Sequence, residues 1–423
     1  MLVDQNNYRE KNFSDLSIFE EWNFEQNKEC KMHKIHAYPA KFPAFITTQA
    51  IRRAEKDGLK IHLVADMFCG CGTTAYEAKL NEKDFWGCDI NPIATLIANT
   101  KVGSYKPSMI EKYLEDIRNL FNTIELNHTT EIRQLNSRIF YWFELQQIKD
   151  LAKLKKAILQ TIPAKSKYKK LFLCGFSNIL KASSKWLQRS IKPTIDKNKK
   201  IIEVLPAFSQ QIKKMQLAVT EQNKNPVNKT SIKIETTNFL TKKILKPKAD
   251  LLITSPPYVT SYEYADLHQL SSLWINEVDD YKTLRKGTIG SCYSKEPDNH
   301  EQLNRTGQAI IDNLLQKDKG RARNVKKYFI DIQNTVKQAS RLLRDGGLSY
   351  FVIGNTEYKE VLIDNAKHLI ESMFNENFKN IRIEKRKISN KSLTPYRTKE
   401  GKFSSDKTCR KIYAEEFIII GSK

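Results

Sequence analysis

Residues Val64–Ala78, VADMFCGCGTTAYEA, give the clearest indication of the fold class of this chain. This stretch passes from an apolar run through a turn with glycines at 70 and 72 into a helix-forming segment. Glycine lets the backbone turn tightly and approach a ligand without a Cβ in the way. The helix N-terminus that follows has free N–H groups, which we expect Thr73 or Thr74 to cap. The spacing fits neither a phosphate loop nor the common dinucleotide-binding loop.

Outward from this stretch, short apolar runs bounded by turn residues predict seven strands. Helix-patterned segments such as Tyr328–Leu343 and Val361–Asn375 lie between most of them. This alternation predicts an α/β fold with a Rossmann-like, mostly parallel sheet. The last two strands lack a clear helix between them and predict a terminal antiparallel hairpin. The predicted strands are Ile61–Asp66, Asp84–Cys88, Ser231–Thr236, Asp250–Thr254, Leu348–Ile353, Ile381–Ile388 and Glu415–Ile420.

One segment interrupts the alternation and suggests how the domains are arranged. Residues 105–228 have apolar residues at helical spacing and predict a mostly helical insertion between the second and third strands. Residues 1–104 and 229–423 would then be the N-terminal and C-terminal parts of one main domain. Within the latter, residues 281–325 mix Arg and Lys with Gly, Ser and Asn, and predict a basic loop region with little core of its own.

Charge gives the first indication of a partner. The 423 residues include 71 Lys and Arg against 48 Asp and Glu, a net charge of +23. Such an excess is typical of a protein that binds a polyanion, although a lysine-rich genome is an alternative explanation. No apolar run is long enough to span a membrane, and no secretory signal opens the chain. Seven cysteines without a repeated spacing predict reduced thiols in a cytoplasmic protein.

The second predicted strand ends in FWGCDINPIA, with Asp89 seventeen residues after Gly72. An acidic residue at this position is where a nucleoside ribose offers its two hydroxyls. Capping the next helix, or closing an Asx turn, is an alternative role that can coexist. Cys69, Cys71 and Cys88 lack a second CxxC pair or a nearby His at ligand spacing, so we expect no metal.

The fourth predicted strand runs directly into Thr254-Ser255-Pro256-Pro257-Tyr258. Two successive prolines fix the backbone and remove two N–H donors, which leaves carbonyls for a ligand. Ser255 adds an oxygen acceptor, and Tyr258 adds an aromatic face that can stack on a base. The prolines could serve only to end the strand, but ligands bind at the carboxyl ends of strands in such sheets.

Together these motifs resemble those of the amino-methylating DNA methyltransferases. FCGCG and TSPPY are similar to the two signature motifs of the family, and His36–Ala44, HAYPAKFPA, is similar to its additional cofactor motif. The resemblance covers about 34–100 and 231–420. It implies S-adenosylmethionine as cofactor, duplex DNA as substrate and a cognate restriction endonuclease as a candidate partner, with no membrane association.

The resemblance also implies roles for individual residues. Asp89 holds the ribose, Ile90 lies against adenine, and Asn238 stands where many members carry an acidic residue. Ser255 and its neighbours contact the target base. The cofactor-binding residues so implied are Lys41, Phe42, Pro43, Asp66, Phe68, Cys69, Gly70, Gly72, Thr73, Asp89, Ile90 and Asn238. The catalytic residues are Ser255, Pro256, Pro257 and Tyr258.

The residues of the TSPPY loop also indicate which base is methylated. Serine at the start of SPPY favours cytosine N4, since members with Asp or Asn there more often methylate adenine. None of the seven cysteines follows a proline, so the covalent route to 5-methylcytosine is unsupported. Adenine N6 methylation, guanine N2 methylation of RNA and a non-catalytic nucleic-acid binder are the alternatives. Three regions are candidates for reading the DNA sequence, namely 105–228, 281–325 and Arg386–Arg410.

Overall fold

The computed structural model describes residues 1–39, 41, 43–227, 229–242, 248–259, 264–275, 278–291, 302–388, 396–397, 403–404, 406, 408, 410–411 and 415–423. All seven predicted strands form within this part of the chain. They are β1 (Leu63–Asp66), β2 (Asp84–Asp89), β3 (Ile232–Thr236), β4 (Ala249–Thr254), β5 (Leu343–Ile353), β8 (Lys379–Lys387) and β12 (Glu415–Ser422).

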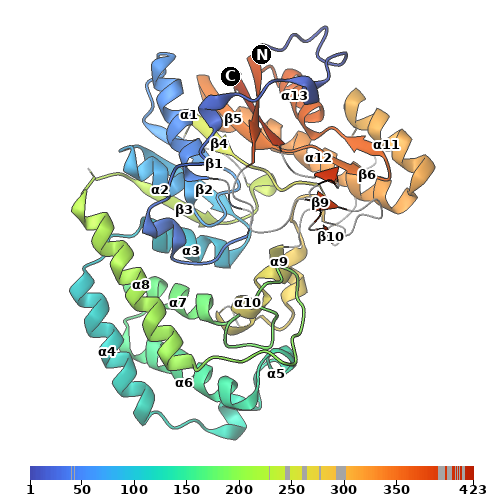
Figure 1. The fold of residues 1–423 in the computed structure, drawn as a ribbon. Coiled ribbons are helices and arrows are strands. Elements are labelled where there is room, and N and C mark those ends of the chain that lie inside the picture. The colour runs from blue at the N-terminus through green and yellow to red at the C-terminus, as the bar shows by residue number, and fades with distance from the viewer. Residues whose placement is uncertain are drawn as a thin grey trace.

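These strands lie in one sheet with the order β3-β2-β1-β4-β5-β12-β8. Figure 1 labels the parallel strands β3, β2, β1, β4 and β5 of this sheet. The pairs among β1 to β5 are parallel, whereas β12 is antiparallel to both β5 and β8. The predicted α/β class, with a mostly parallel sheet and a terminal antiparallel pair, is therefore confirmed.

Helices cover both faces of this sheet, because successive side chains of a strand point to opposite faces. Val64 and Ile253 pack toward α1 and α2 on one face, and Ala65 and Leu252 pack toward α12 and α13 on the other. Burying a Leu or Ile side chain contributes about 1.5–3 kcal/mol, so this alternation fixes which face each helix covers. The helices around the sheet are α1 (Ala44–Lys56), α2 (Thr73–Leu80), α3 (Pro92–Val102), α11 (Arg305–Lys317), α12 (Lys319–Leu342) and α13 (Asn365–Asn375).

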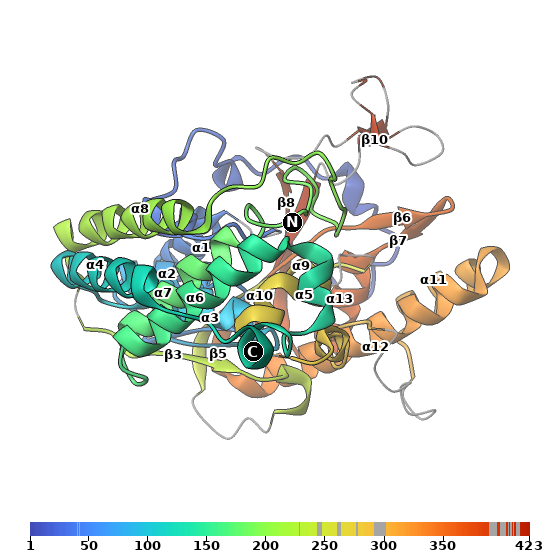
Figure 2. The same cartoon turned by 90° about the horizontal axis from the view of Figure 1, so that it is seen from below.

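Residues 105–228 form a second body of the molecule, here called the helical half (Figures 1 and 2). In α4, Ile110, Leu114 and Ile117 are buried at helical spacing, as expected for an amphipathic helix. The predicted helical insertion is therefore present, although its standing as a separate domain stays a prediction. Its main helices are α4 (Pro107–Thr123), α5 (Ser137–Trp142), α6 (Leu145–Thr161), α7 (Lys167–Ile179) and α8 (Val204–Lys224).

The helical half is joined to the sheet by two short helices that follow β4, α9 (Tyr264–Leu267) and α10 (Gln269–Ile275). Trp274 of α10 belongs to the same apolar core as Trp142, and Trp142 Nε1 donates to Gln269 Oε1 at 2.9 Å. The chain segment that carries TSPPY therefore ends against the helical half.

Two predicted segments differ from the structure. The pattern over Val361–Asn375 predicts one helix, but Val361–Ile363 forms strand β7, paired with β6 (Thr356–Tyr358). Helix α13 begins only at Asn365, because the Asp364 side chain caps it by accepting from the backbone N–H of Lys367. β-branched residues at the start of this run fit a strand as well as a helix.

The region 281–325 is also not a continuous loop. It contains the 3₁₀ helix η6 (Tyr281–Arg285), all of α11 and the start of α12. Ile310, Ile311 and Leu314 of α11 are buried, so this part of the region has a core. Polar residues lie between those apolar positions, so the helical spacing of the apolar residues was not recognised in the sequence.

The N-terminal segment covers the edge of the sheet. The backbone N–H of Val3 donates to the Ile381 carbonyl, and that of Phe19 donates to the Lys385 carbonyl, both at 2.8 Å. Trp22 is fully buried, and its indole N–H donates to Glu384 Oε2 at 2.6 Å. The open edge of β8 is thereby paired along part of its length, which limits association with other strands. Among the described helices, we find none with the length and apolar character needed to cross a lipid bilayer.

Candidate active site

A cavity of about 240 Å³ lies at the carboxyl ends of the central parallel strands. The glycine turn after β1, the ends of β2 and β3 and the SPPY loop after β4 all contribute to its wall. Eight of the sixteen predicted site residues therefore meet around one space. They are Phe68, Gly70, Asp89, Ile90, Asn238, Ser255, Pro257 and Tyr258.

Gly70 and Gly72 of the turn have different structural roles. Gly70 has φ of +47° and lines the cavity, where a Cβ would come 3.5 Å from the Tyr38 hydroxyl. Gly72 has φ of +75° and faces α3, where a Cβ would come 2.6 Å from the Ala98 Cβ. Gly70 therefore leaves room at the ligand, whereas Gly72 allows two helices to pack closely. Gly72 itself is the N-cap of α2, and neither Thr73 nor Thr74 has that role.

Asp89 holds the glycine turn in place and also faces the cavity. Its Oδ2 accepts the Gly70 N–H at 2.9 Å, and its Oδ1 accepts the Asn91 N–H at 2.8 Å. Burial raises the pKa of Asp89 to about 6. The next helix is capped by the side chain of Asn91, so Asp89 closes an Asx turn and does not cap the helix. Each carboxylate oxygen can still accept a further bond.

Asp66 supports the site without lining it. Its Oδ1 accepts from the Phe68 N–H at 3.0 Å and from the Thr254 hydroxyl at 2.7 Å, and its Oδ2 accepts from the Thr74 hydroxyl at 2.7 Å. Burial raises its pKa to about 6. Asp66 therefore ties β1, α2 and the end of β4 together. Cys69 and Thr73 are also buried and do not line the cavity.

The SPPY loop presents its serine and tyrosine to the cavity. The Ser255 hydroxyl donates to the Val352 carbonyl at 3.0 Å. Its proton is thus engaged, and the oxygen lone pairs are left to accept. The Tyr258 hydroxyl donates to Glu416 Oε2 at 2.7 Å. Pro256 is buried below this surface, and Pro257 lines it.

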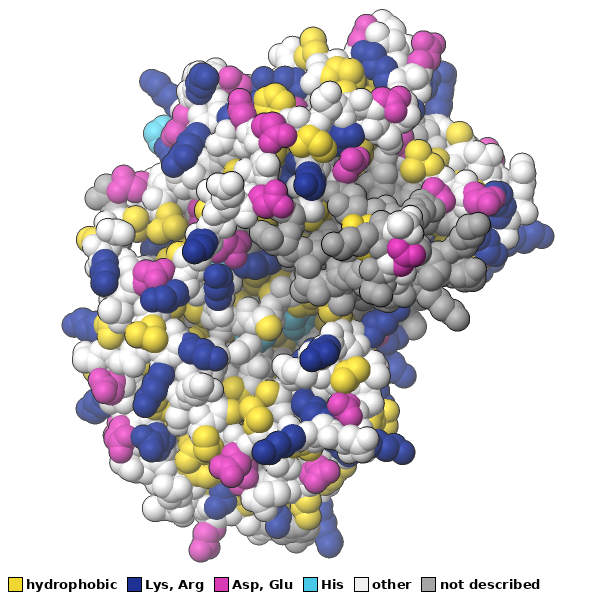
Figure 3. Space-filling view, viewed as in Figure 1, with side chains coloured by type: hydrophobic (Ala, Val, Ile, Leu, Met, Phe, Trp, Pro, Cys, Tyr) yellow, Lys and Arg dark blue, Asp and Glu magenta, His cyan; other side chains and the backbone are white. Residues whose placement is uncertain are grey.

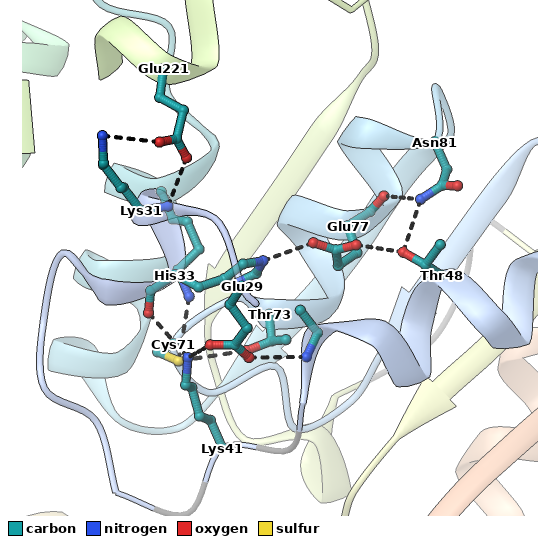
Figure 4. A network of polar contacts seen from close by, with 12 residues as sticks. Glu29, Lys31, His33, Lys41, Thr48, Cys71, Thr73, Glu77, Asn81 and Glu221 are labelled. Atoms are coloured by element: carbon teal, nitrogen blue, oxygen red, sulfur yellow. Dashed lines mark hydrogen bonds and ion pairs between the residues drawn. The ribbon is translucent and has the colours of Figure 1, made fainter. Parts of the chain in front are cut away.

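The additional motif contributes a residue other than those predicted. Lys41 Nζ donates to Glu29 Oε2 at 2.6 Å and to the His33 carbonyl at 3.1 Å (Figure 4), and it does not line the cavity. Phe42 lies outside the described residues, and Pro43 is the N-cap of α1. Tyr38 lines the cavity instead, with its ring stacked on His268 at 5.1 Å.

The network around Lys41 continues to the helical half. His33 and Thr48 both contact the carboxylate of Glu77, and Lys31 pairs with Glu221 of α8 at 3.2 Å (Figure 4). Burial lowers the pKa of His33. These contacts fix the segment before α1 against α2 and α8, so that Tyr38 is held at the cavity.

Near Ile90, the predicted residue Asn238 holds a segment around Gly287 that the motifs did not indicate. Asn238 Nδ2 donates to the Gly287 carbonyl at 3.2 Å, and Asn238 Oδ1 accepts the Leu240 N–H at 2.9 Å. Gly287 has φ of +81°, and a Cβ there would come 3.2 Å from Ile90 Cδ1. Asn238 thus positions the segment over Ile90. Other lining residues that were not predicted are Tyr38, Met67, Asn91, Thr237, Phe239, Val259, Ala265, Leu284, Thr288, Ile289, Gly290, Arg321, Asn324, Val325 and Tyr328.

Metal ligands do not gather in the described part of the chain, where we find no group of three or more His, Cys, Asp or Glu residues placed to hold an ion. Cys69, Cys71 and Cys88 are free, buried thiols, and burial raises the pKa of Cys88 above its ordinary value. The cavity wall combines aromatic and apolar groups with polar side chains such as Asp89, Asn238 and Arg321.

Comparison with known proteins agrees with the motifs. Residues 3–100 match the family model described as DNA methylase, for N6 and N4 methyltransferases. The chain is 24% identical over 387 residues to the type II methyltransferase M.MvaI of Kocuria varians, covering 85% of each chain. Among solved structures, the rRNA methyltransferase aviRa of Streptomyces viridochromogenes aligns with 9% identity, a TM-score of 0.31 and coverage of 92% of this chain and 88% of that one. TehB of Haemophilus influenzae aligns with 7% identity, a TM-score of 0.28 and coverage of 89% and 62%.

Proposed function

We propose that this chain is an S-adenosylmethionine-dependent DNA methyltransferase of the N6/N4 type that methylates N4 of cytosine within a short duplex sequence. The match of residues 3–100 to the DNA methylase family and the similarity to a type II methyltransferase over 85% of the chain support this proposal. Ser255 carries this proposal. Its hydroxyl proton is directed to Val352, so its oxygen faces the cavity as an acceptor. An acceptor at this position suits an exocyclic amine, which offers two N–H donors.

The cavity wall fits the cofactor's chemistry. Asp89 offers carboxylate oxygens for two ribose hydroxyls, and Ile90 and Phe239 offer apolar surface for adenine. Gly70 leaves the space that a Cβ would fill. Phe68 lies in the same wall. When bound, S-adenosylmethionine supplies an activated sulfonium methyl group, so the protein has mainly to position the acceptor.

The catalytic residues then act on the amine. The lone pair of the exocyclic nitrogen is delocalised into the ring. Hydrogen bonds from its N–H groups to Ser255 Oγ and the Pro256 carbonyl favour a more pyramidal nitrogen, which makes the lone pair available for attack. The surplus proton leaves to water after transfer. Tyr258 stacks on the base, which must first leave the duplex.

The helical half is the part best suited to the DNA backbone. It holds 23 Lys and Arg against 10 Asp and Glu, whereas the rest of the chain holds 48 against 38. Figure 3 shows Lys and Arg side chains spread over this half on the viewed face. Phosphate contacts position a protein on DNA without specifying the sequence. We propose this half as the main DNA-binding region, in a cytoplasmic enzyme of a restriction-modification system with a cognate endonuclease.

The test identifies the modified nucleoside. Unmethylated plasmid DNA is incubated with the purified protein and labelled S-adenosylmethionine, digested to nucleosides and analysed by chromatography and mass. We expect N4-methylcytosine, and modification-sensitive sequencing of the same DNA maps the site. N6-methyladenine would contradict the assignment of the base while leaving the mechanism intact. 5-Methylcytosine would contradict the mechanism itself.

A further inference from the structure

Strand β12 brings a distant part of the sequence to the catalytic edge of the sheet. The parallel strands β4 and β5 end at this edge, and β12 begins there because it runs in the opposite direction, with Phe417 opposite Ile353. The residues at the start of β12 therefore lie beside the SPPY loop. Glu416 is one of them, 158 residues beyond Tyr258 in the sequence.

Glu416 contacts Tyr258 on one side and an arginine on the other. Its Oε2 accepts the Tyr258 hydroxyl at 2.7 Å, and its Oε1 pairs with Nη1 of Arg386, which lies directly opposite on β8. Arg386 is 1% exposed and Glu416 is 6% exposed. A buried carboxylate of this kind is tolerated when it is paired and hydrogen-bonded.

The Tyr258 ring also packs against the backbone of Gly354. A Cβ at Gly354, the residue that follows β5, would come 3.2 Å from Tyr258 Cε2. The ring thus rests against glycine backbone while its hydroxyl is held by a carboxylate. Further support comes from the N-terminal segment, where the Trp22 carbonyl accepts from Arg386 Nε at 3.4 Å.

We propose that Glu416, oriented by Arg386, is a positioning residue for methyl transfer that holds the Tyr258 ring at the angle in which it stacks on the target base. This inference rests on the proposed function, because it assumes that the base enters the cavity beside Ser255. Rotation about the Cβ–Cγ bond would otherwise leave the ring free to tilt. Glu416 contributes by holding the Tyr258 ring, before the base enters the cavity, in the orientation that stacks on the base.

The tyrosine hydroxyl has no part in proton transfer on this account. Burial, with the neighbouring Glu416 charge, holds the pKa of Tyr258 well above its usual range. The phenol therefore stays protonated and keeps donating to Glu416. Only its aromatic face is presented to the base.

The experiment is a double-mutant cycle measured under single-turnover conditions on a duplex containing the mapped site. Tyr258→Phe keeps the ring and removes the donor, and Glu416→Gln removes the charge with little change in shape. We expect each single variant to slow methyl transfer about tenfold, the factor of one ordinary hydrogen bond. The double variant should be no slower than the slower single variant, because both changes act on the same contact. The Gln amide keeps an oxygen but loses the charged acceptor that strengthens the bond from the Tyr258 hydroxyl. Affinity for S-adenosylmethionine should not change.

A spectroscopic measurement separates positioning from a merely structural role. A fluorescent base analogue at the target position is quenched when it stacks on an aromatic ring, and Glu416→Gln should reduce that quenching. Glu384→Gln is the matched control. Glu384 is a similarly buried carboxylate on β8 that is paired with Arg53 and Trp22, away from Tyr258. Glu384→Gln should lower thermal stability and leave the fluorescence quenching unchanged. Its effect on the methyl-transfer rate should be the same with or without Tyr258→Phe.

The outcomes distinguish this inference from the proposed function. If the wild-type protein transfers no methyl group to DNA, the proposed function fails and this inference fails with it. If the wild type is active and the losses from Tyr258→Phe and Glu416→Gln multiply in the double variant, Glu416 does not act through Tyr258. A folded Glu416→Gln variant with wild-type rate and quenching would also overturn the inference alone.

Discussion

The sheet with its covering helices and the helical half differ in what their buried residues do. At the carboxyl edge of the sheet, buried polar groups such as Asp66 and Glu416 hold loops in place through hydrogen bonds. The core of the helical half is mostly apolar, built from residues such as Ile148, Leu151 and Phe172, and its surface holds most of the excess positive charge. On the function proposed above, reaction geometry and DNA affinity are set in separate parts of the chain. Four predictions test that separation.

The largest effect is expected at Ser255. Ser255→Ala removes the acceptor that meets the amine, and we expect methyl transfer to slow about 100-fold, as when one preorganised hydrogen bond to a reacting group is lost. Duplex affinity should stay within twofold, because the phosphate contacts lie elsewhere. Single-turnover rates and equilibrium DNA binding measure the two quantities. An equal loss of methyl-transfer rate and of duplex affinity would contradict the separation of reaction geometry from DNA binding.

The next effect concerns the cofactor. Asp89→Ala removes the charged acceptor for two ribose hydroxyls, and we expect S-adenosylmethionine binding to weaken by about 1.5–3 kcal/mol, measured by calorimetry. Asp84→Ala is the matched control, since Asp84 begins the same strand and accepts only from the Ser231 N–H at its far end. An unchanged dissociation constant for Asp89→Ala would refute the assignment.

A smaller effect is expected from charge on the helical half. Lys192, Lys197 and Lys200 are exposed in its long loop. Replacing all three by Ala should reduce the slope of log K against log salt by about 2–3, at roughly 0.9 per phosphate contact. Three exposed lysines at the opposite edge of the sheet, Lys56, Lys60 and Lys379, form the control. If both triple variants reduced the salt slope of DNA binding equally, the positive charge would contribute to DNA binding wherever it lies on the protein.

The smallest effect is a pH dependence of cofactor binding. The pKa of Asp89 is raised to about 6 from 3.8 by burial, and ribose hydroxyls donate to the ionised form. Binding should therefore be strongest above pH 6 and weaken as the pH falls through 6, by at most about tenfold per unit. In the free protein the sign is opposite for stability, which should decline as the pH rises from about 4 to 6, because Asp89 ionises in the unfolded chain while burial keeps it protonated in the folded protein. Asp89→Asn should flatten the binding profile, whereas the stability profile keeps the contribution of Asp66, whose pKa burial also raises to about 6.

The sequence alone predicted the sheet well, because its strands are short apolar runs bounded by turn residues. It also predicted the part of the cavity formed by contiguous motifs, such as Gly70, Asp89 and Ser255. Gly287 and Arg321 were missed because they reach the cavity from segments whose place only the tertiary fold determines. Tyr38 lies within the additional cofactor motif, but the resemblance pointed to Lys41, Phe42 and Pro43 of that motif. Lys41 and Asp66 were assigned to the cofactor, yet they tie loops together, and a motif does not distinguish lining from support. Whether the remaining residues bind the cofactor stays a prediction.

The position of β12 between β5 and β8 has a consequence for the order of folding. The contact of β12 with the catalytic loop joins residues 158 positions apart, and the N-terminal segment contacts β8 across 362 positions in the case of Trp22 and Glu384. Contacts of such long range form slowly. Glu416 reaches Tyr258 only after β12 has entered the sheet. The catalytic loop should therefore become rigid late, after the parallel core has formed. Hydrogen exchange during refolding would show protection at β1 and β4 before protection at β12.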